Sequence, residues 1–359
     1  MTAAPLSIRS ADACRWDLAA LGEVMLRLDP GEGRVRTARR FDVWEGGGEY
    51  NVARALAKGF GRRTTAVTAL PRNDLGLLVD DLMAQGGVDR SHVVWREFDG
   101  IGRNTRVGLN FTERGFGVRP ARGVSDRAGS AASQLMREEI DGGRLFGAEG
   151  VRWFHTGGIF AALSESSAET ALAAVKAAQA SGAVVSYDLN YRASLWAAHA
   201  DPEAARRVNR EIARHVDVMI GDAWGFRACL GLDVDAKADL ETAARAYAAE
   251  FPEVRIVAAT LRTADTAGRN DWSAQAWSDG RVVSSVARPG LDVLDRVGGG
   301  DGFVAGLAHA LLDGMDLQAA VEWGAAHGAL AMTTAGDTSM VDASEVAALV
   351  AGGDARSVR

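Results

Sequence analysis

Three consecutive glycines, Gly298 to Gly300, run directly into Asp301 and then into the apolar segment 303–312, which predicts a buried helix. Glycines at a helix entrance leave backbone N–H groups open to a ligand, with the positive end of the helix dipole behind them. Such a turn is an anion site. A carboxylate repels a bound phosphate, so Asp301 is better suited to take a proton from an alcohol that attacks the phosphate. The stretch therefore predicts phosphoryl transfer; the alternative is an ordinary loop with an Asp helix cap.

Two further polar stretches are candidates for ligand contacts. Gly46–Gly48 opens a predicted helix, and Asn51, one turn in, can offer both a donor and an acceptor to vicinal hydroxyls. Asp188, Asn190 and Arg192 follow a predicted strand, at the edge where α/β sheets bind ligands. Arg192 can meet a phosphate or carboxylate with its planar fork. Each stretch on its own is equally compatible with a structural turn.

Other phosphate and metal motifs are missing from the sequence. There is no Gly-Lys dipeptide, which excludes the Walker phosphate loop. The six histidines and two cysteines form no His-x-x-x-His or Cys-x-x-Cys spacing. We therefore expect no metal held by protein side chains alone.

The elements that must position these residues alternate between strand and helix. An apolar run over 17–28 predicts a first buried strand, followed by a helix over 52–57, a strand over 63–70 and a helix over 75–86. This rhythm is typical of a parallel sheet covered by helices. It returns as strands over 151–156, 184–189, 216–220 and 254–259, two more strands within 271–287, and helices over 166–181, 202–215, 237–250, 302–313 and 317–334.

Residues 29–45 and 93–125 interrupt this rhythm. The second segment contains β-like runs separated by glycine and aspartate, and it is rich in arginine. We expect the two segments to form a small antiparallel lid over one end of the core, which closes over bound substrate and shields it from water. The chain is thus predicted to be one large domain carrying a small lid.

Composition restricts the partners. The 359 residues are 47% apolar and 24% charged, as in ordinary globular domains. A net charge of −7 argues against nucleic acid or an anionic membrane as the main partner. No stretch approaches the roughly 18 apolar residues of a membrane helix, and we see no signal peptide. Two distant cysteines suit a reducing compartment, so we expect a cytoplasmic protein.

Together the motifs resemble those of the ribokinase-like (PfkB) carbohydrate kinases. The resemblance covers about residues 17–345 in order, including the lid. Within that family the chain looks most like the 2-keto-3-deoxygluconate kinase branch. The motifs that carry the resemblance are Gly46-Gly47-x-x-x-Asn51-Val-Ala53, Asp188-x-Asn190-x-Arg192, Asp295-x-x-Gly298-Gly-Gly300-Asp301, Gly22-Glu23, the segment from Arg127 to Ser133, and Leu195-Trp196.

The resemblance implies a three-layer α/β/α core with a mostly parallel sheet. It also implies an ATP-dependent transfer of the γ-phosphate to a primary hydroxyl of a sugar acid. Mg²⁺ would bridge the ATP phosphates and keep several water ligands. It implies Asp301 as general base, with the backbone amides of Gly298, Gly299 and Gly300 holding the charge on the phosphoryl. It assigns the sugar side to Gly47, Gly48, Asn51, Asn110, Arg127, Arg192 and Asp337, and the nucleotide side to Asn190, Arg192, Thr260, Arg262 and Thr263. Arg127 would face the carboxylate of the sugar acid.

The chain departs from the branch at three places. Ser125-Asp126 stands where two tyrosines usually precede the arginine, and Asn110 aligns with a third tyrosine. Asp222-Ala-Trp-Gly225 aligns with the family's Asn-x-x-Glu element, so its acidic end is missing, and Asp222 is a partial substitute. Two alternatives therefore stay open: a kinase for a neutral ketose such as fructose, and a sugar-binding regulatory protein on the same fold. The resemblance also suggests a homodimer that forms through the lid.

Overall fold

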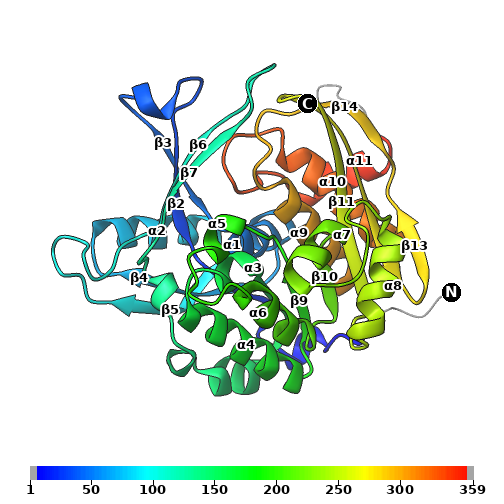
Figure 1. Ribbon diagram of the computed structural model, residues 1–359, viewed down its shortest axis with the longest axis horizontal. Coiled ribbons are helices and arrows are strands. Elements are labelled where there is room, and N and C mark those ends of the chain that lie inside the picture. Colours follow the sequence, from blue (N-terminus) through cyan, green and yellow to red (C-terminus); the bar gives the residue numbers. More distant parts are fainter. Residues whose placement is uncertain (1–5, 354–359) are drawn as a thin grey trace.

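The computed structural model describes residues 6–353, and one large sheet runs through its centre (Figure 1). The strand order is β13-β12-β11-β10-β9-β8-β1-β4-β5, with β14 paired to β12. All pairs from β11 to β5 are parallel, whereas β12, β13 and β14 pair antiparallel at one edge, so the expected mostly parallel sheet is confirmed. The strands are β1 (Trp16–Leu21), β4 (Thr64–Pro71), β5 (Asp89–Arg96), β8 (Val151–Gly157), β9 (Val184–Asp188), β10 (Val218–Ile220), β11 (Ile256–Thr266), β12 (Arg269–Ser278), β13 (Arg281–Ser284) and β14 (Arg288–Asp292).

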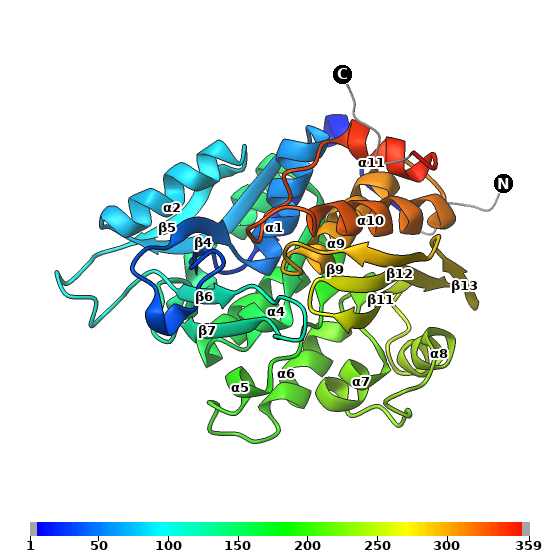
Figure 2. The ribbon, with the colours of Figure 1, turned by 90° about the horizontal axis from the view of Figure 1, so that it is seen from above.

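Helices cover both faces of this sheet. Seen from above, α1, α2, α9, α10 and α11 lie on one side and α4 to α8 on the other, which gives three layers (Figure 2). The helices are α1 (Gly48–Arg54), α2 (Asp74–Gln85), α3 (Gly158–Ala161), α4 (Glu165–Ala180), α5 (Ala193–Trp196), α6 (Ala204–Ala213), α7 (Ala223–Gly225), α8 (Leu240–Glu250), α9 (Gly299–Leu312), α10 (Leu317–Ala331) and α11 (Ala343–Val350).

The central strand β1 explains why the sheet needs both helix layers. All six of its residues are buried. Leu18 and Ala20 pack into the apolar cluster beneath α1 and α9, while Ala19 and Leu21 pack into the cluster on the opposite face. A strand that is apolar on both faces is stable only when both are covered.

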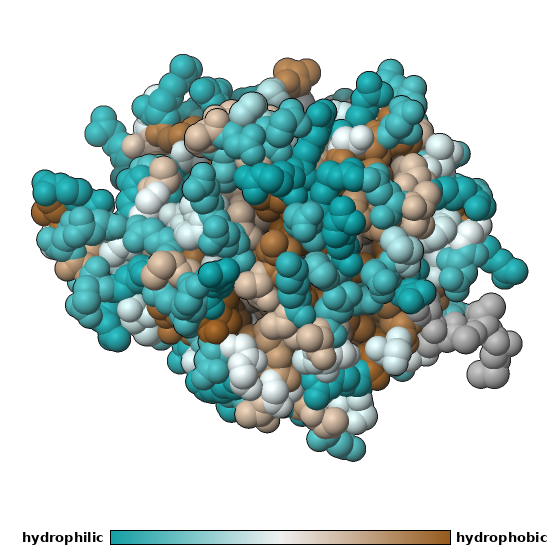
Figure 3. Space-filling model, turned by 60° about the horizontal axis from the view of Figure 1, so that its bottom comes forward, coloured by the Kyte–Doolittle hydropathy of each residue, from teal (hydrophilic) through white to brown (hydrophobic). Residues whose placement is uncertain are grey.

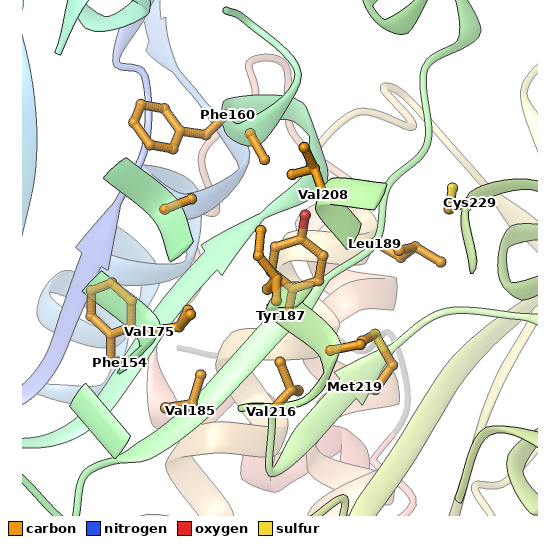
Figure 4. Packing of buried hydrophobic residues seen from close by; sticks show 14 of the residues in the cluster. Phe154, Phe160, Val175, Val185, Tyr187, Leu189, Val208, Val216, Met219 and Cys229 are labelled. Carbon is orange, nitrogen blue, oxygen red and sulfur yellow. The ribbon is translucent and has the colours of Figure 1, made fainter. Parts of the chain in front are cut away.

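The cluster on the α4 side is centred on β9 and its neighbours (Figure 4). Tyr187 lies among Val185, Leu189 and Met219, and its hydroxyl donates a hydrogen bond to Asn209 Oδ1 (2.8 Å). Satisfying this buried hydroxyl removes the cost of its desolvation. The packed core thus holds the end of β9 in place.

A second, smaller sheet stands on the carboxyl-end side of the large one, at the upper left of Figure 1. Its order is β3-β2-β6-β7, with β2 parallel to β6 and the other pairs antiparallel. The strands are β2 (Met25–Asp29), β3 (Asp42–Gly46), β6 (Leu109–Glu113) and β7 (Arg122–Asp126).

This sheet corrects three expectations. Residues 17–28 are not one strand: the chain bends after Leu21, and β2 joins the small sheet. Gly22 allows the bend, because a Cβ there would collide with Glu49. The second lid segment also starts later than residue 93, because β5 pairs with β4 in the large sheet. The small sheet is mixed rather than antiparallel.

No helix among residues 6–353 is long and apolar enough to cross a membrane. The face drawn in Figure 3 is mostly polar, with apolar patches between charged side chains.

Candidate active site

The centre of the site is Asp301, in the first turn of α9. The helix begins at Gly299, earlier than the predicted residue 302, so the glycines themselves form its entrance. Asn51 on α1 donates a hydrogen bond from Nδ2 to Asp301 Oδ2 (2.6 Å). Burial raises the pKa of Asp301 to about 7; the Asn51 hydrogen bond opposes this shift, and the carboxylates of Asp188 and Asp337 add to it. A base with this pKa can accept a proton near neutral pH.

The helix entrance is shaped by backbone that needs glycine. Gly298 has φ +82°, and a Cβ there would collide with the backbone oxygen of Asp337. At Gly299 a Cβ would press on Met332, while at Gly300 it would meet no described atom within 4 Å. The first amides of a helix have no intrahelical partner, and Gly298 has no side chain to cap them. These amides are therefore available to an anion.

The second glycine turn lies opposite the first. Gly47 has φ +152° and fits against the backbone oxygen of Glu23, where a Cβ would collide. A Cβ on Gly48 would lie 3.7 Å from Asp301 Oδ1. The turn therefore brings bare backbone close to the carboxylate of Asp301.

Two further carboxyls surround Asp301. Burial raises the pKa of Asp188, at the end of β9, to about 6, although Arg192 opposes the shift. Burial raises the pKa of Glu49, on α1, to about 8, with Asp301 and Asp188 adding to the shift and Arg127 opposing it. The backbone nearby is also unusual: Asn190 has φ +27°, and its amide donates to Asp188 Oδ1 (3.1 Å). Carboxyls with strongly raised pKa values and residues with strained backbone conformations often occur at functional sites.

Asn51, Asp188, Asn190 and Asp301 line one cleft of about 630 Å³ between the two sheets. Its walls include the carboxyl ends of β9 and β10, the middle of β11, and residues of β6 and β7. Most of the residues expected from the sequence lie in it: Gly47, Gly48, Asn51, Asn110, Arg127, Asn190, Arg192, Thr260, Gly298, Gly300, Asp301 and Asp337.

Three expected residues lie outside the cleft wall. Gly299 faces Met332 behind the turn. Arg262 and Thr263 are on the exposed part of β11, beyond Thr260, and Arg262 Nη1 donates to Asn270 Oδ1 (3.4 Å). The strand runs past the edge of the cleft and carries these two side chains away from it.

The cleft also contains residues that were not among the predicted site residues. Asp188, Arg122, Arg296 and Asp222 all line it. Asp188 is a specified residue of a family motif, so its place there was a usable signal, whereas Arg296 stands at a position that its motif leaves open. Asp222 Oδ1 accepts a hydrogen bond from the amide of Gly225 (2.8 Å), which makes it the cap of the short helix α7.

Arg127 lies beside a polar part of the cleft wall. Arg127 forms an ion pair with the buried Glu23. On the small sheet, Ser125 Oγ donates to Asn110 Oδ1 (3.2 Å), and Asn110 Nδ2 donates to Thr112 Oγ1 (3.1 Å). These hydrogen bonds connect three polar side chains along this part of the wall.

Comparisons with known proteins agree with this geometry. The model of the pfkB family carbohydrate kinases matches residues 16–344, and the chain belongs to the PfkB family of carbohydrate kinases. It is a phosphotransferase that acts on a sugar hydroxyl, as the names of its relatives also indicate.

Three proteins show which carbohydrate kinases the chain is similar to. A 2-dehydro-3-deoxygalactonokinase of Haloferax volcanii is 32% identical over 94% of this chain and 98% of its own. A 5-dehydro-2-deoxygluconokinase of Shouchella clausii is 26% identical over 96% of this chain and 98% of its own. The crystal structure of a 2-dehydro-3-deoxygluconokinase of Thermotoga maritima has a TM-score of 0.85 and 33% identity, and the match covers 93% of this chain and 99% of that one.

Across residues 6–353, no group of three or more His, Cys, Asp or Glu side chains is arranged to hold a metal ion.

Proposed function

We propose that this protein is an ATP-dependent kinase that transfers the γ-phosphate to a primary hydroxyl of a 2-keto-3-deoxy sugar acid, with 2-keto-3-deoxygluconate as the first candidate. The observation that carries the proposal is the placement of Asp301. It lies in the uncapped first turn of α9, faces the second glycine turn, and has a pKa of about 7. A base beside an anion site is the arrangement that alcohol phosphorylation requires.

Each wall of the cleft has a role in this proposal. Asp301 accepts the hydroxyl proton through Oδ1 or Oδ2, and Asn51 orients that carboxylate through its 2.6 Å hydrogen bond. The amides of the Gly298–Gly300 turn hold the charge that develops on the transferring phosphoryl. Because these donors are fixed by the backbone, they need little reorganisation when the charge appears.

The sugar side is formed by Gly47, Gly48, Asn110 and Asp337, and Arg127 faces the carboxylate of the substrate. Asn190, Arg192 and Thr260 lie on the nucleotide side. Arg262 and Thr263 are not part of this arrangement, since they project from the exposed end of β11.

The residues near the nucleotide side fit Mg²⁺. Carboxylate and amide oxygens are the hard ligands that this ion prefers, and Asp188, Asn190 and Asp222 offer them along one wall of the cleft. Bound there, Mg²⁺ would supply charge neutralisation to the phosphates, with waters completing its shell. The chain lacks the acidic residue expected at Gly225, so Asp222 carries this role.

One observation favours a second candidate. The charge of Arg127 is already balanced by Glu23. A neutral ketose such as fructose would suit a balanced pair better than a sugar acid would. The two candidates differ only in what faces Arg127, and share the chemistry at Asp301.

The test is ADP release with Mg-ATP over a panel of 2-keto-3-deoxygluconate, 2-keto-3-deoxygalactonate, 5-keto-2-deoxygluconate and fructose. We expect turnover on a 2-keto-3-deoxy acid. Turnover confined to fructose would retain the mechanism and overturn the acid substrate. Absence of turnover on every sugar acid and ketose would overturn the proposal.

A further inference from the structure

Arg27, on β2 of the small sheet, is entirely buried, with 0% of its side chain exposed. Its two terminal nitrogens reach carboxylates on three separate segments. Nη1 donates to Asp337 Oδ1 (2.6 Å), while Nη2 donates to Asp29 Oδ2 (3.0 Å) and to Asp295. A buried charge is tolerated only when it is well paired, and nearby carboxylates raise the pKa of this guanidinium, which keeps it charged.

Two of these carboxylates belong to the segments that shape the glycine turn. Asp295 is three residues before Gly298, and its Oδ1 accepts a hydrogen bond from the amide of Val297 (3.1 Å). The backbone oxygen of Asp337 lies directly against Gly298, leaving no space for a Cβ. Arg27 therefore holds the chain on both sides of the turn.

The same cluster touches the second glycine turn. A Cβ on Gly46 would lie 2.5 Å from Asp337 Oδ2. Gly46 ends β3, which pairs with β2 along its length, so Asp337 stands between the small sheet and the α9 entrance. Arg27 itself does not line the cleft and cannot touch substrate directly.

The geometry depends on the shape of arginine. A guanidinium holds two nitrogens at a fixed separation in one plane, so it sets the spacing between Asp337 and Asp295. A lysine ammonium is a single point on a flexible stem. It preserves the positive charge but cannot occupy both positions at once.

We propose that Arg27 is a positioning residue that couples the small sheet to the phosphoryl-binding turn, through Asp295 and Asp337. This inference rests on the proposed role of Gly298–Gly300 in binding the phosphoryl. When the small sheet settles on bound sugar, β2 carries Arg27 with it, and the paired carboxylates set the amides of the turn.

The test compares Arg27→Lys with a matched control, Arg114→Lys. Arg114 also contacts Asp29 (3.3 Å), but within residues 6–353 it makes no ion pair with Asp295 or Asp337. Amide hydrogen exchange is followed over residues 295–301, and kcat and KM are measured with the sugar that the wild-type protein phosphorylates. For Arg27→Lys we expect exchange of the turn to rise about tenfold or more relative to the rest of the chain, and kcat to fall by about 10–100-fold, as expected for small misplacements of binding groups.

Arg114→Lys should behave as the wild-type protein in both measurements. Exchange at 297–300 that is equal in the two variants would overturn the inference, as would a lowered Tm with unchanged kcat. If Arg27→Lys does not fold, Asp295→Asn replaces it, since Arg27 then keeps Asp29 and Asp337 as partners and Asp295 does not line the cleft. Failure of the proposed function is distinguishable, because wild-type protein would then turn over no sugar while the exchange comparison still decides the coupling.

Discussion

Asn51 and Asp301 join the two glycine turns across the cleft through a single hydrogen bond of 2.6 Å. They lie 250 residues apart in the chain, Asn51 in the middle of α1 and Asp301 in the first turn of α9. The contact fixes one carboxylate oxygen of Asp301 and lowers its pKa against the effect of burial. The proposed base and the residue that orients it therefore come from opposite ends of the sequence.

Replacement of Asp301 by Asn tests its role as general base. The amide keeps the shape of the side chain but cannot accept the proton. We expect kcat to fall by about 10²–10⁴, the usual contribution of a general base, with little change in ATP affinity measured by calorimetry. Asp265→Asn, on the exposed end of β11, is a matched control and should retain full activity. An Asp301→Asn variant with wild-type kcat would exclude the assignment.

The pH profile tests the environment of the same carboxyl. Because Asp301 acts when ionised and has a pKa of about 7, kcat/KM should rise with pH through about 7 and then level off. In Asn51→Ala the hydrogen bond that lowers this pKa is lost, so the rise should move to higher pH. A profile that is flat between pH 6 and 8 in the wild-type protein would contradict the role of Asp301 as the titrating base.

The sequence singled out Asn51 and Asp301 as candidate site residues but did not predict the hydrogen bond between them. Gly46–Gly48, Asn51 and Asp301 are all in short motifs whose chemistry is local, so their types and spacing were informative. Two of the three carboxylate partners of Arg27, Asp295 and Asp337, are 268 and 310 residues away, and no local pattern connects them with Arg27. Only the topology of two sheets brings these charges together.

The errors in strand assignment have a related cause. Residues 17–28 look like one apolar strand because both halves are buried, but in different sheets. The break depends on the space that Glu49 leaves at Gly22, which is a tertiary contact. The β-like pattern after residue 89 likewise could not show which sheet β5 would join.

The buried carboxyls predict how stability depends on pH. Glu49 is 5% exposed, and burial raises its pKa to about 8. A carboxyl whose folded-state pKa is raised contributes stability at pH values below its unfolded pKa, and this contribution is lost as pH rises through the folded pKa. Ionisation of Glu49 alone should therefore cost the ligand-free protein on the order of 3 kcal/mol between pH 5 and pH 8.5, measured by urea unfolding, and the raised pKa values of Asp301 and Asp188 add to the decline.

Glu49→Gln removes this ionisation and should make the decline less steep, while the part due to Asp301 and Asp188 remains. Glu149→Gln is a suitable comparison, because its neighbours, His92 and Trp16 among them, lower the pKa of Glu149 to about 2. The stabilising effect of ionised Glu149 is present at pH values above its unfolded pKa. Glu149→Gln should therefore lose stability at pH 7 and keep the steep decline of stability toward pH 8.5. An unchanged slope in Glu49→Gln would show that other groups cause the decline.

Two alanine substitutions separate the structural and catalytic roles of the glycine turn. Gly298→Ala should destabilise the fold by roughly 1–3 kcal/mol, because φ is +82° and the methyl group would collide with Asp337. Gly300→Ala meets no described atom within 4 Å and lies in a helix, so stability should be unchanged or rise by up to about 1 kcal/mol. If Gly300 lies against the phosphoryl, kcat in this stable variant should still fall at least about tenfold. If Gly300→Ala retained the wild-type kcat, the transferred phosphoryl group would not lie against Gly300.

The last prediction concerns the choice between a sugar acid and a neutral ketose. Arg127→Met alone would leave Glu23 buried and unpaired, so the double variant Arg127→Met/Glu23→Gln is the cleaner comparison. If Arg127 binds the carboxylate, KM for the sugar acid should rise by about 10–100-fold, the range of one charge-assisted contact, while KM for fructose changes little. Arg122→Met, which removes an exposed cleft arginine, controls for the general loss of positive charge. Equal increases of KM for acid and ketose would mean that Arg127 supports the cleft through Glu23 and does not bind the carboxylate.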